Sequence, residues 1–199
     1  MLNYAADILR RAAPLVPVFF CVDNYVGTIK LVGGRSMQPT FNSRGKEHND
    51  VVVLDRWSAR QLAYQRGDVV VLRSPSNPSE LMTKRIVGLP GDWVRPRADA
   101  TNGQSSSTPV AVPRGHLWVE GDNEHASKDS NNFGPIAAAL VEARVAFKLV
   151  PHNEAGFVTR KDIAPDRLIH RARVESIAGA VQAHAGTLPW HLSPLTRPP

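Results

Sequence analysis

The sequence predicts a mostly β protein, in which a domain built as a β-sheet or barrel follows one N-terminal transmembrane helix. Three observations support this fold class: an apolar stretch near the N-terminus, several short runs of β-branched residues, and frequent turn residues between those runs. The 14 glycines and 16 prolines are above average for 199 residues, which favours strands and turns over a helical bundle. The hydrophobic content of 42% is ordinary for a folded domain of this length.

The apolar stretch AAPLVPVFFCV, at residues 12–22, follows two arginines and resumes after Asp23 at residues 25–29. A spanning helix needs about 20 mostly apolar residues, and this one reaches that length only if Asp23 is accommodated. A cleaved signal peptide or a buried core helix are the alternatives, but no clear small-residue cleavage site follows and two prolines disfavour the helix. We expect an uncleaved anchor within residues 1–30, with the arginines keeping the N-terminus on the cytosol-like side.

Short runs rich in Val, Ile and Leu, bounded by turn residues, predict the strands of the main domain. These runs occupy residues 51–57, 66–74, 80–97, 116–123 and 139–150. The run at 80–97 contains two strands joined by a turn, residues 58–65 form a helical turn or a loop, and residues 98–110 form an exposed loop. The main domain is therefore expected at residues 31–150.

Residues 151–199 form a C-terminal extension in this interpretation. Helical periodicity over residues 166–184 predicts a helix, and the ending TLPWHLSPLTRPP predicts a loose, proline-rich tail. The extension is therefore expected to be partly helical and then loose, and it has no assigned role.

The charge of the chain points to no nucleic-acid partner. The formal net charge is +6, from 24 Lys and Arg against 18 Asp and Glu, but the basic residues are scattered rather than gathered in one stripe. No helix-turn-helix spacing and no zinc-finger pattern is present. The single cysteine rules out an internal disulfide.

A serine in a turn and a lysine in a strand could form a catalytic pair. Ser36 lies in the turn GGRSMQPT, and Lys84 shares one strand face with Met82 and Ile86, which would strip water from its amine. Burial can lower a lysine pKa from about 10.4 by up to about 3–5 units, so that Lys84 could accept the serine proton. A plain turn serine and a solvent-exposed lysine are the simpler alternatives. Seven histidines leave a Ser-His-Asp set open, and Arg85 reads as a surface or substrate-side charge.

A polar segment, GDNEHASKDSNNFGPI at residues 121–136, is the third candidate site. Asp122, Glu124, His125 and Asp129 are possible metal ligands, but their spacing fits no calcium loop or other metal motif. A polar loop that orients another group by hydrogen bonds agrees better with this composition.

Together these segments resemble the type I signal peptidase family. GRSMQPT resembles its nucleophile box, RGDVVVL the strand that follows, KRIVGLPGD its lysine box, and GDNEHASKDSNNFGPI its glycine-aspartate-asparagine box. The boxes stand in the family's order, and the resemblance covers roughly residues 10–150. Within the family, WVEGDN and DSNNFGP resemble the mitochondrial inner membrane peptidase most, and particularly its second subunit.

The resemblance implies a role for each residue of the catalytic group. Ser36 would be the nucleophile, with its backbone N–H as one oxyanion donor, and Lys84 would be the general base. Ser127 would hydrogen-bond the lysine amine and hold it towards the serine. Asp129 and Ser130 would brace the loop that carries Ser127.

The resemblance also implies supporting residues, with two departures from bacterial relatives. Met37 and Pro39 would shape the nucleophile turn. Gly34 stands where bacterial relatives often carry a hydroxyl residue as a second oxyanion donor. Asn131 stands where they carry an arginine that braces the aspartate, so a hydrogen-bonded brace is expected in place of an ionic one.

The function implied by the resemblance is that of a membrane-anchored serine endopeptidase in the mitochondrial inner membrane, facing the intermembrane space. Its partners would be presequence-bearing precursor proteins, a homologous catalytic subunit 1 and the lipid bilayer, and no cofactor or metal is implied. A self-cleaving repressor-type protease and a non-catalytic assembly factor on the same β scaffold are the alternatives. The presence of Ser36, Lys84 and Ser127 disfavours the second of these.

Overall fold

The structure is a computed structural model that describes residues 13–14, 27–45, 49–97 and 108–169. Most of the predicted anchor, the predicted helix beyond residue 169 and the proline-rich tail therefore lie outside the described residues. Within the described ranges no helix is both long enough and apolar enough to cross a membrane.

The described strands form one large antiparallel sheet and one small one. In the large sheet the strands follow the order β1 (Gly27–Val32), β2 (Asp50–Asp55), β9 (Val141–Val150), β3 (Val69–Arg73), β4 (Leu81–Gly88), β7 (His116–Glu120) and β8 (Ile136–Ala137), and β10 (Gly156–Phe157) also pairs with β9. The small sheet has the order β11 (Leu168–Ile169), β5 (Trp93–Val94) and β6 (Val110–Ala111). This arrangement confirms the prediction of a mostly β fold.

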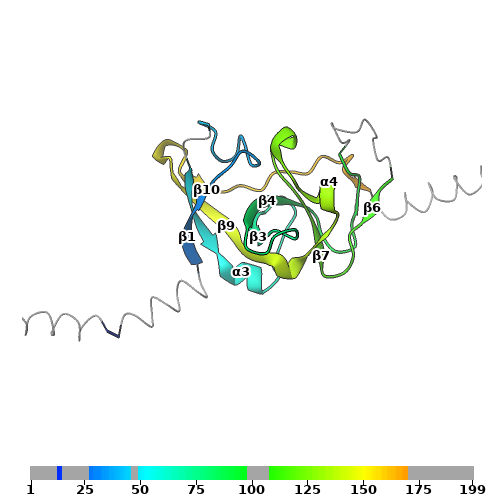
Figure 1. Cartoon of the computed structure of the whole chain (residues 1–199), viewed down its shortest axis with the longest axis horizontal. Helices are drawn as coiled ribbons and strands as arrows, with labels where there is room; N and C mark the ends of the chain where they lie inside the picture. The colour runs from blue at the N-terminus through cyan, green and yellow to red at the C-terminus, as the bar shows by residue number, and fades with distance from the viewer. Residues whose placement is uncertain (1–12, 15–26, 46–48, 98–107, 170–199) are drawn as a thin grey trace, which may run out of the picture.

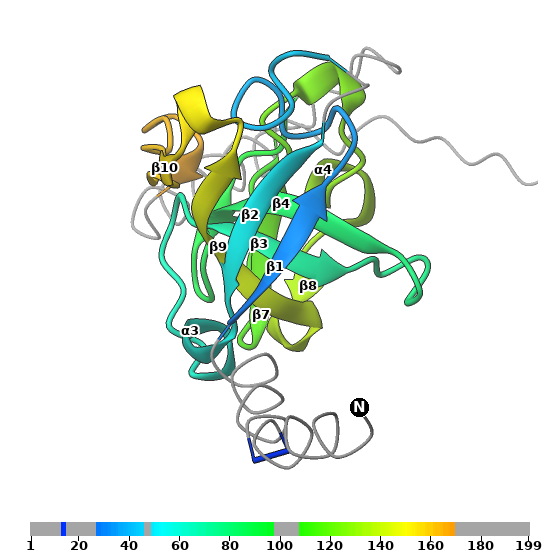
Figure 2. The same cartoon turned by 90° about the vertical axis from the view of Figure 1, so that its left-hand side faces the viewer.

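The large sheet curls because β9 is shared between its two parts. The first residues of β9 pair with β3 and its later residues pair with β2, with register shifts in both pairings. Figure 2 shows the consequence, in which β3 and β4 cross behind β1, β2 and β9 at a steep angle. Apolar side chains fill the space that the curl encloses, among them Phe41 from the loop after β1. A curled sheet of this kind encloses its own core, so little helix is needed to cover it.

Short helical segments connect the strands. They are α3 (Arg56–Arg60), α4 (Ser130–Phe133) and the 3-10 turns η2 (Glu124–Ala126), η3 (Ala138–Leu140) and η4 (His152–Glu154). Asp55 caps α3 by accepting a hydrogen bond from the Ser58 N–H, and Asp129 caps α4 in the same way from Asn131. These caps fix where each turn starts, and the cap of α4 also fixes a loop of the candidate site.

The predicted strands are confirmed, and the differences lie elsewhere. Strand β1 was not predicted, and its first residues, 27–30, fall in the stretch assigned to the anchor. The two-residue strands β6, β8 and β10 were not predicted either, and β6 begins at Val110, the last residue of the predicted exposed loop. Residues 56–60, which include the end of the predicted strand 51–57, form α3. The prediction of helix from residue 166 is wrong for residues 168–169, because Leu168 and Ile169 pair with Val94 and Trp93 as β11.

Candidate active site

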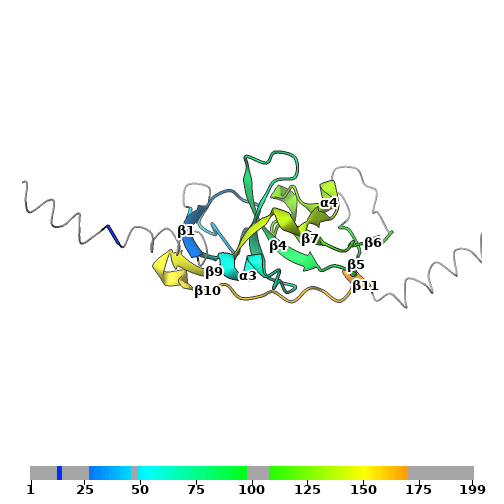
Figure 3. The same ribbon diagram turned by 90° about the horizontal axis from the view of Figure 1, so that it is seen from below.

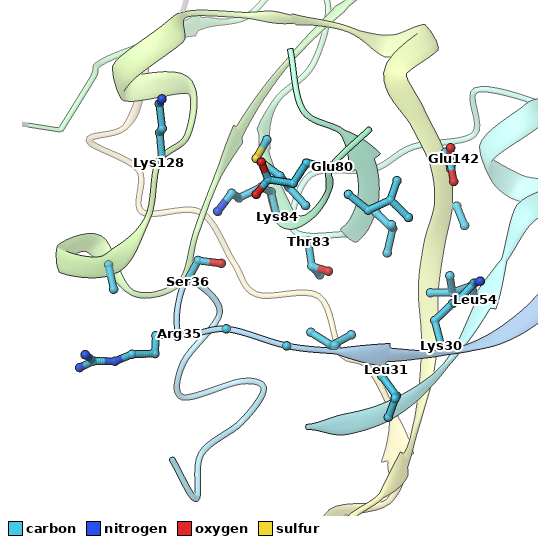
Figure 4. A pocket seen from close by; sticks show the side chains of 18 of the residues that line it. Lys30, Leu31, Arg35, Ser36, Leu54, Glu80, Thr83, Lys84, Lys128 and Glu142 are labelled. Atoms are coloured by element: carbon cyan, nitrogen blue, oxygen red, sulfur yellow. The ribbon is translucent and has the colours of Figure 1, made fainter. Parts of the chain in front are cut away.

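Ser36 and Lys84 line the same cavity, which has a volume of about 390 Å³. Its walls come mainly from β1 and the turn after it, from residues 80–84 at and just before the start of β4, from one residue each of β2 and β3, and from two residues of β9. In Figure 4 the Ser36 hydroxyl and the Lys84 amine lie on the same side of this cavity, with Thr83 and Glu80 beside the lysine. The structure thus brings together two residues that are 48 positions apart in the sequence.

Two backbone edges lie open along this cavity. In the described sheet β1 has a strand partner on one side only, which is β2. The first half of β4 pairs with β3, whereas β7 pairs only with the second half, from Arg85 onward. A strand edge without a partner offers N–H and C=O groups to an extended peptide. The cavity can therefore accept a peptide chain between the two edges.

The turn that carries Ser36 is held from its backbone. Gly34 has φ +85°, a conformation that favours glycine, and its carbonyl accepts a hydrogen bond of 2.9 Å from the Asn42 side chain. The carbonyl of Ser36 accepts a hydrogen bond of 3.0 Å from the Asn123 N–H. Among the described residues, neither the N–H nor the hydroxyl of Ser36 has a hydrogen-bond partner. Both groups are thus available to a ligand.

Asn42 is the main support of this turn and was missed by the sequence analysis. It is buried with φ 55°, and it exchanges two hydrogen bonds with Asp50: its own N–H donates to the Asp50 carboxylate, and its side-chain oxygen accepts from the Asp50 N–H. Lys148 then pairs with Asp50 at 3.1 Å and donates to the Thr40 carbonyl at 2.7 Å. The only sequence signal was an asparagine at the end of a turn, where asparagine tolerates positive φ.

Lys84 is buried, with 3% of its surface exposed, and its amine donates a hydrogen bond of 3.1 Å to the Ser127 hydroxyl. Burial lowers the pKa of Lys84 below its ordinary value, although the negative charges of Asp129 and Glu80 partly oppose the shift. The interpretation of a solvent-exposed lysine is therefore wrong. No hydrogen bond links Lys84 to Ser36 among the described residues.

The loop before α4 fixes the direction of the Ser127 hydrogen bonds. Ser127 donates its hydroxyl proton to Asp129 Oδ2 at 2.7 Å, and that oxygen also accepts from the Gly121 N–H at 2.9 Å. The other carboxylate oxygen accepts from the Asn131 side chain at 2.8 Å, a hydrogen-bonded brace rather than an ionic one. The Ser130 hydroxyl forms no hydrogen bond with Ser127 or the Asp129 carboxylate, and instead accepts from the Val119 N–H at 3.0 Å, which ties α4 to β7.

Gly121 is required where these segments meet. A Cβ at Gly121 would lie 2.3 Å from the Ser127 hydroxyl oxygen and 2.5 Å from the Ser36 carbonyl oxygen. Both distances are far inside van der Waals contact, so only glycine fits between the serine turn and the Ser127 loop. The close approach brings the Ser36 backbone next to the hydroxyl that holds Lys84.

Arg85 is buried beside the site, contrary to the prediction of a surface or substrate-side charge. It forms two hydrogen bonds to the Asp122 carboxylate, at 2.8 and 2.7 Å, and donates to the Gly67 carbonyl at 2.7 Å. Asp122 also accepts a hydrogen bond of 2.5 Å from Thr40. Burial acts to raise the pKa of Asp122, but the hydrogen bonds from Arg85 and Thr40 outweigh it and hold this pKa below its ordinary value.

The remaining candidate residues are those of the serine turn, the histidines and the possible metal ligands. Met37 is buried in the core, where it anchors the serine turn, whereas Pro39 lies in the exposed part of that turn. Of the histidines, 116, 125 and 152 are described, and none of them lines the cavity with Ser36. The possible metal ligands Asp122 and Asp129 are each committed to protein partners, Arg85 and Ser127 respectively.

The sequence model of the family described as "Signal peptidase, peptidase S26" matches residues 5–102 and 97–150 of the chain. The chain therefore belongs to the signal peptidase family S26 and is a peptidase of signal-peptidase type. It is 43% identical to "Mitochondrial inner membrane protease subunit 2" of Mus musculus over 136 residues, covering 68% of this chain and 74% of that protein.

Two further relatives bear related names. The protein of the same name in Schizosaccharomyces pombe is 42% identical over 142 residues, covering 71% of this chain and 74% of that protein. "Mitochondrial inner membrane protease subunit 1" of Mus musculus is 37% identical over 138 residues, covering 69% and 78%. The resemblance to the mitochondrial branch of the family, and to its second subunit, is thereby confirmed.

Proposed function

We propose that this chain is a membrane-anchored serine endopeptidase that removes sorting presequences from proteins delivered to the mitochondrial intermembrane space, with Ser36 and Lys84 as its catalytic pair. The observation that carries the proposal is the direction of hydrogen bonding around Ser127. A carboxylate only accepts hydrogen bonds, so the Ser127 O–H donates to Asp129 and the serine oxygen is left to accept from Lys84. The lone pair of a neutral Lys84 amine is then not used by Ser127.

In the proposed reaction the free lone pair takes the proton of Ser36 while the serine oxygen attacks the scissile carbonyl carbon. The oxyanion that forms is stabilised by the Ser36 N–H, which has no partner among the described residues. The carbon–nitrogen bond then breaks, and the Lys84 ammonium returns its proton to the departing amine. The product of this half-reaction is an ester between Ser36 and the N-terminal part of the substrate.

Water completes the cycle. A water molecule gives a proton to the neutral Lys84 amine as it attacks the ester carbon, and the ester bond breaks. The proton passes back to the Ser36 oxygen, and the presequence leaves as a carboxylic acid that ionises by losing its proton to water. Gly34 supplies no hydroxyl as a second oxyanion donor, and its φ of +85° makes a hydroxyl residue strained there, so a backbone group or water would be the second donor.

The substrate in this proposal is an extended peptide between the β1 and β4 edges. The residues that line the cavity with Ser36 include Val32, Ala126 and Ala143, and we expect such side chains to leave room for small residues before the scissile bond. The relatives named as mitochondrial inner membrane protease subunits support a location in that membrane and an assembly with a homologous catalytic subunit 1. The anchor within residues 1–30 would hold the site close to emerging presequences, in a single-pass topology.

Processing in isolated mitochondria tests the proposal. Ser36→Ala and Lys84→Ala should each abolish presequence removal while the protein still accumulates, and retained presequences can be identified by mass spectrometry of N-termini. His125→Ala, which changes an exposed residue outside the cavity, should process normally. If Lys84→Ala processes normally and His125→Ala does not, a histidine is the base and the pair is wrong. Complete release of the protein by carbonate extraction would refute the anchor.

A further inference from the structure

The segment 156–169, called here the C-terminal strap, lies beyond the residues that match the family model and packs along the main domain. It starts at β10, which pairs with β9, and ends at β11, which pairs with β5 (Figure 3). Between these ends Arg160 forms an ion pair of 2.7 Å with the buried Asp68. A Cβ on Gly67 would lie 2.5 Å from the Lys161 carbonyl oxygen, so the strap packs directly on the turn before β3.

Near its end the strap contacts a buried carboxylate. Arg167 forms an ion pair with Glu120, the last residue of β7, which is only 1% exposed. Backbone contacts fix the strap at this point, because the Arg95 N–H donates to the Arg167 carbonyl at 2.9 Å. The Trp118 ring N–H donates to the same Glu120 oxygen at 2.8 Å. The buried Glu120 carboxylate thus joins the strap to β7, the strand that leads into the loop carrying Ser127.

The second oxygen of Glu120 faces Arg97. Arg97 Nε lies 3.0 Å from Glu120 Oε2, and both atoms are buried without a well-aligned hydrogen bond, so their attraction is that of an ion pair. Glu120 therefore carries an arginine on each side, one from the strap and one from the segment after β5. A buried charge left without its partner is strongly destabilising, so Glu120 holds both arginines against it. Arg97 Nε also lies 3.3 Å from Glu124 Oε1, so Arg97 is held between the buried Glu120 and a carboxylate of the Ser127 loop.

Arg97 in turn holds both ends of the loop that carries Ser127. Its side chain donates to the Gly121 carbonyl at 3.1 Å, and its backbone N–H donates to the Asn131 side-chain oxygen at 2.8 Å. Gly121 and Asn131 are two of the groups that hydrogen-bond the Asp129 carboxylate. A continuous set of contacts therefore runs from the strap to the acceptor of the Ser127 proton.

We propose that Arg97 is a positioning residue for the Ser127 loop, and that the C-terminal strap holds Arg97 in place through Arg167 and Glu120. The inference rests on the proposed function, because the consequence for catalysis passes through Ser127 and Lys84. Loss of the Arg97 side chain removes the hydrogen bond to the Gly121 carbonyl, whereas the backbone N–H of residue 97 still donates to Asn131. The start of the segment 121–131 can then move, which weakens the hold of Ser127 on the lysine amine. A displacement of about 1 Å in such a group can cost about 10²-fold in rate.

The test uses the full-length chain and Arg97→Gln, Arg167→Gln and the matched control Arg95→Gln. Arg95 is exposed and contributes only backbone contacts to the strap, so its variant removes the same charge two positions from Arg97. Cleavage of a presequence peptide should show kcat lowered about 10-fold to 100-fold in Arg97→Gln with KM within about 2-fold of wild type. Arg167→Gln should show a smaller loss of kcat, and Arg95→Gln should match wild type.

A double-variant cycle separates positioning from general damage. In a Ser127→Ala background, Arg97→Gln should add little further loss if Arg97 acts through Ser127, whereas independent effects would multiply. Hydrogen exchange gives a readout that does not need activity: amides of residues 121–131 should exchange faster in Arg97→Gln and Arg167→Gln than in Arg95→Gln. Equal exchange in the three variants, or multiplicative losses, would overturn the inference even if peptide cleavage by Ser36 stands. Absence of cleavage by the wild-type chain would instead refute the proposed function, with exchange still deciding the role of Arg97.

Discussion

Lys84 donates a hydrogen bond to Ser127 instead of receiving one, because the Ser127 O–H already donates to Asp129. The amine is thereby oriented by a group that does not compete for its lone pair. Buried lysines are costly to charge, and this one lies in a wall that also contains Ser36.

The first prediction concerns the Ser127 hydroxyl. Ser127→Ala leaves the lysine amine and one oxygen of Asp129 without this partner, so kcat should fall by at least about 10²-fold with KM nearly unchanged, as for loss of an oriented general base. Ser130→Ala is the informative comparison, because it removes the acceptor for the buried Val119 N–H and should cost about 1–3 kcal/mol of folding free energy. Peptide cleavage kinetics and chemical denaturation measure the two effects. An undiminished kcat in Ser127→Ala would contradict the role of Ser127.

The second prediction concerns the close approach at Gly121. The Cβ of Gly121→Ala would overlap both the Ser127 hydroxyl and the Ser36 carbonyl, so cleavage should be lost and the free energy of unfolding should fall by about 1–3 kcal/mol. Gly156→Ala in β10 is the matched control, since no atom lies within 4 Å of the Cβ it would add. It should leave cleavage and thermal unfolding as they are in the wild type. Active Gly121→Ala would show that the two serines are not held together as described.

The sequence predicted the parts of this site that local pattern determines. The strand around Lys84 was predicted from a run of apolar residues bounded by turn residues. The alternation along that strand favoured a desolvated Lys84 but left a solvent-exposed lysine open, and the structure shows that Lys84 is buried. The turn around Ser36 followed from Gly and Pro. The roles of Ser36, Lys84 and Ser127 came from family resemblance, and their assignment as a catalytic group remains a prediction.

The contacts that the sequence analysis missed join segments distant in the chain. Arg85 looked like a surface charge because it alternates with Lys84, but β4 is covered on both faces and its partner Asp122 comes from another loop. The extension after residue 150 showed helical periodicity, yet pairing with β5 and the contact of Arg167 with Glu120 decide its structure. Tertiary pairing of this kind overrides local propensity, and no single stretch of sequence displays it.

The third prediction concerns the buried ion pair of Arg85 and Asp122, whose side chains are 4% and 5% exposed. Asp122→Asn leaves the guanidinium without its counter-charge and should cost about 3–5 kcal/mol of folding free energy. Arg66→Gln is the control, because Arg66 pairs with Asp92 at the surface, where such pairs contribute up to about 1 kcal/mol. Denaturant titration at neutral pH measures both. A loss in Asp122→Asn no larger than that in Arg66→Gln would show that Asp122 does not compensate the buried charge.

The same pair gives a pH dependence of stability. The pKa of Asp122 is lower in the folded than in the unfolded chain, so the unfolded state binds more protons between the two values and stability falls as the pH falls through them. The contribution is fully present above the unfolded carboxyl value of about 3.9. The wild type should therefore lose its advantage over Asp122→Asn as the solution is acidified below that pH. Denaturant titrations of both proteins from pH 7 to pH 3 measure this difference in the free energy of unfolding. A difference that stays constant over this range would contradict the lowered pKa of Asp122.

The last prediction concerns the pH dependence of cleavage and the Glu80 carboxylate, which works against the lowered pKa of Lys84. Burial lowers the pKa of Lys84, so kcat/KM should rise with pH through that lowered value as the amine loses its proton. Glu80 lines the cavity beside Lys84, and its negative charge favours the ammonium. Glu80→Gln should therefore move the rise in kcat/KM to lower pH and increase cleavage on the acidic side.

Because Glu80 is exposed, salt screens its effect, and the difference from wild type should shrink between low ionic strength and about 1 M salt. Glu142→Gln provides the comparison, since Glu142 lines the same cavity but is paired with Arg73 at 2.6 Å and does not act on the lysine. For Glu142→Gln, kcat/KM should rise with pH over the same range as in the wild type. Lys84→Arg should give no cleavage at any pH, because a guanidinium stays protonated. A Glu80→Gln profile displaced to higher pH would mean that the group titrating in kcat/KM is not a lysine that must be neutral.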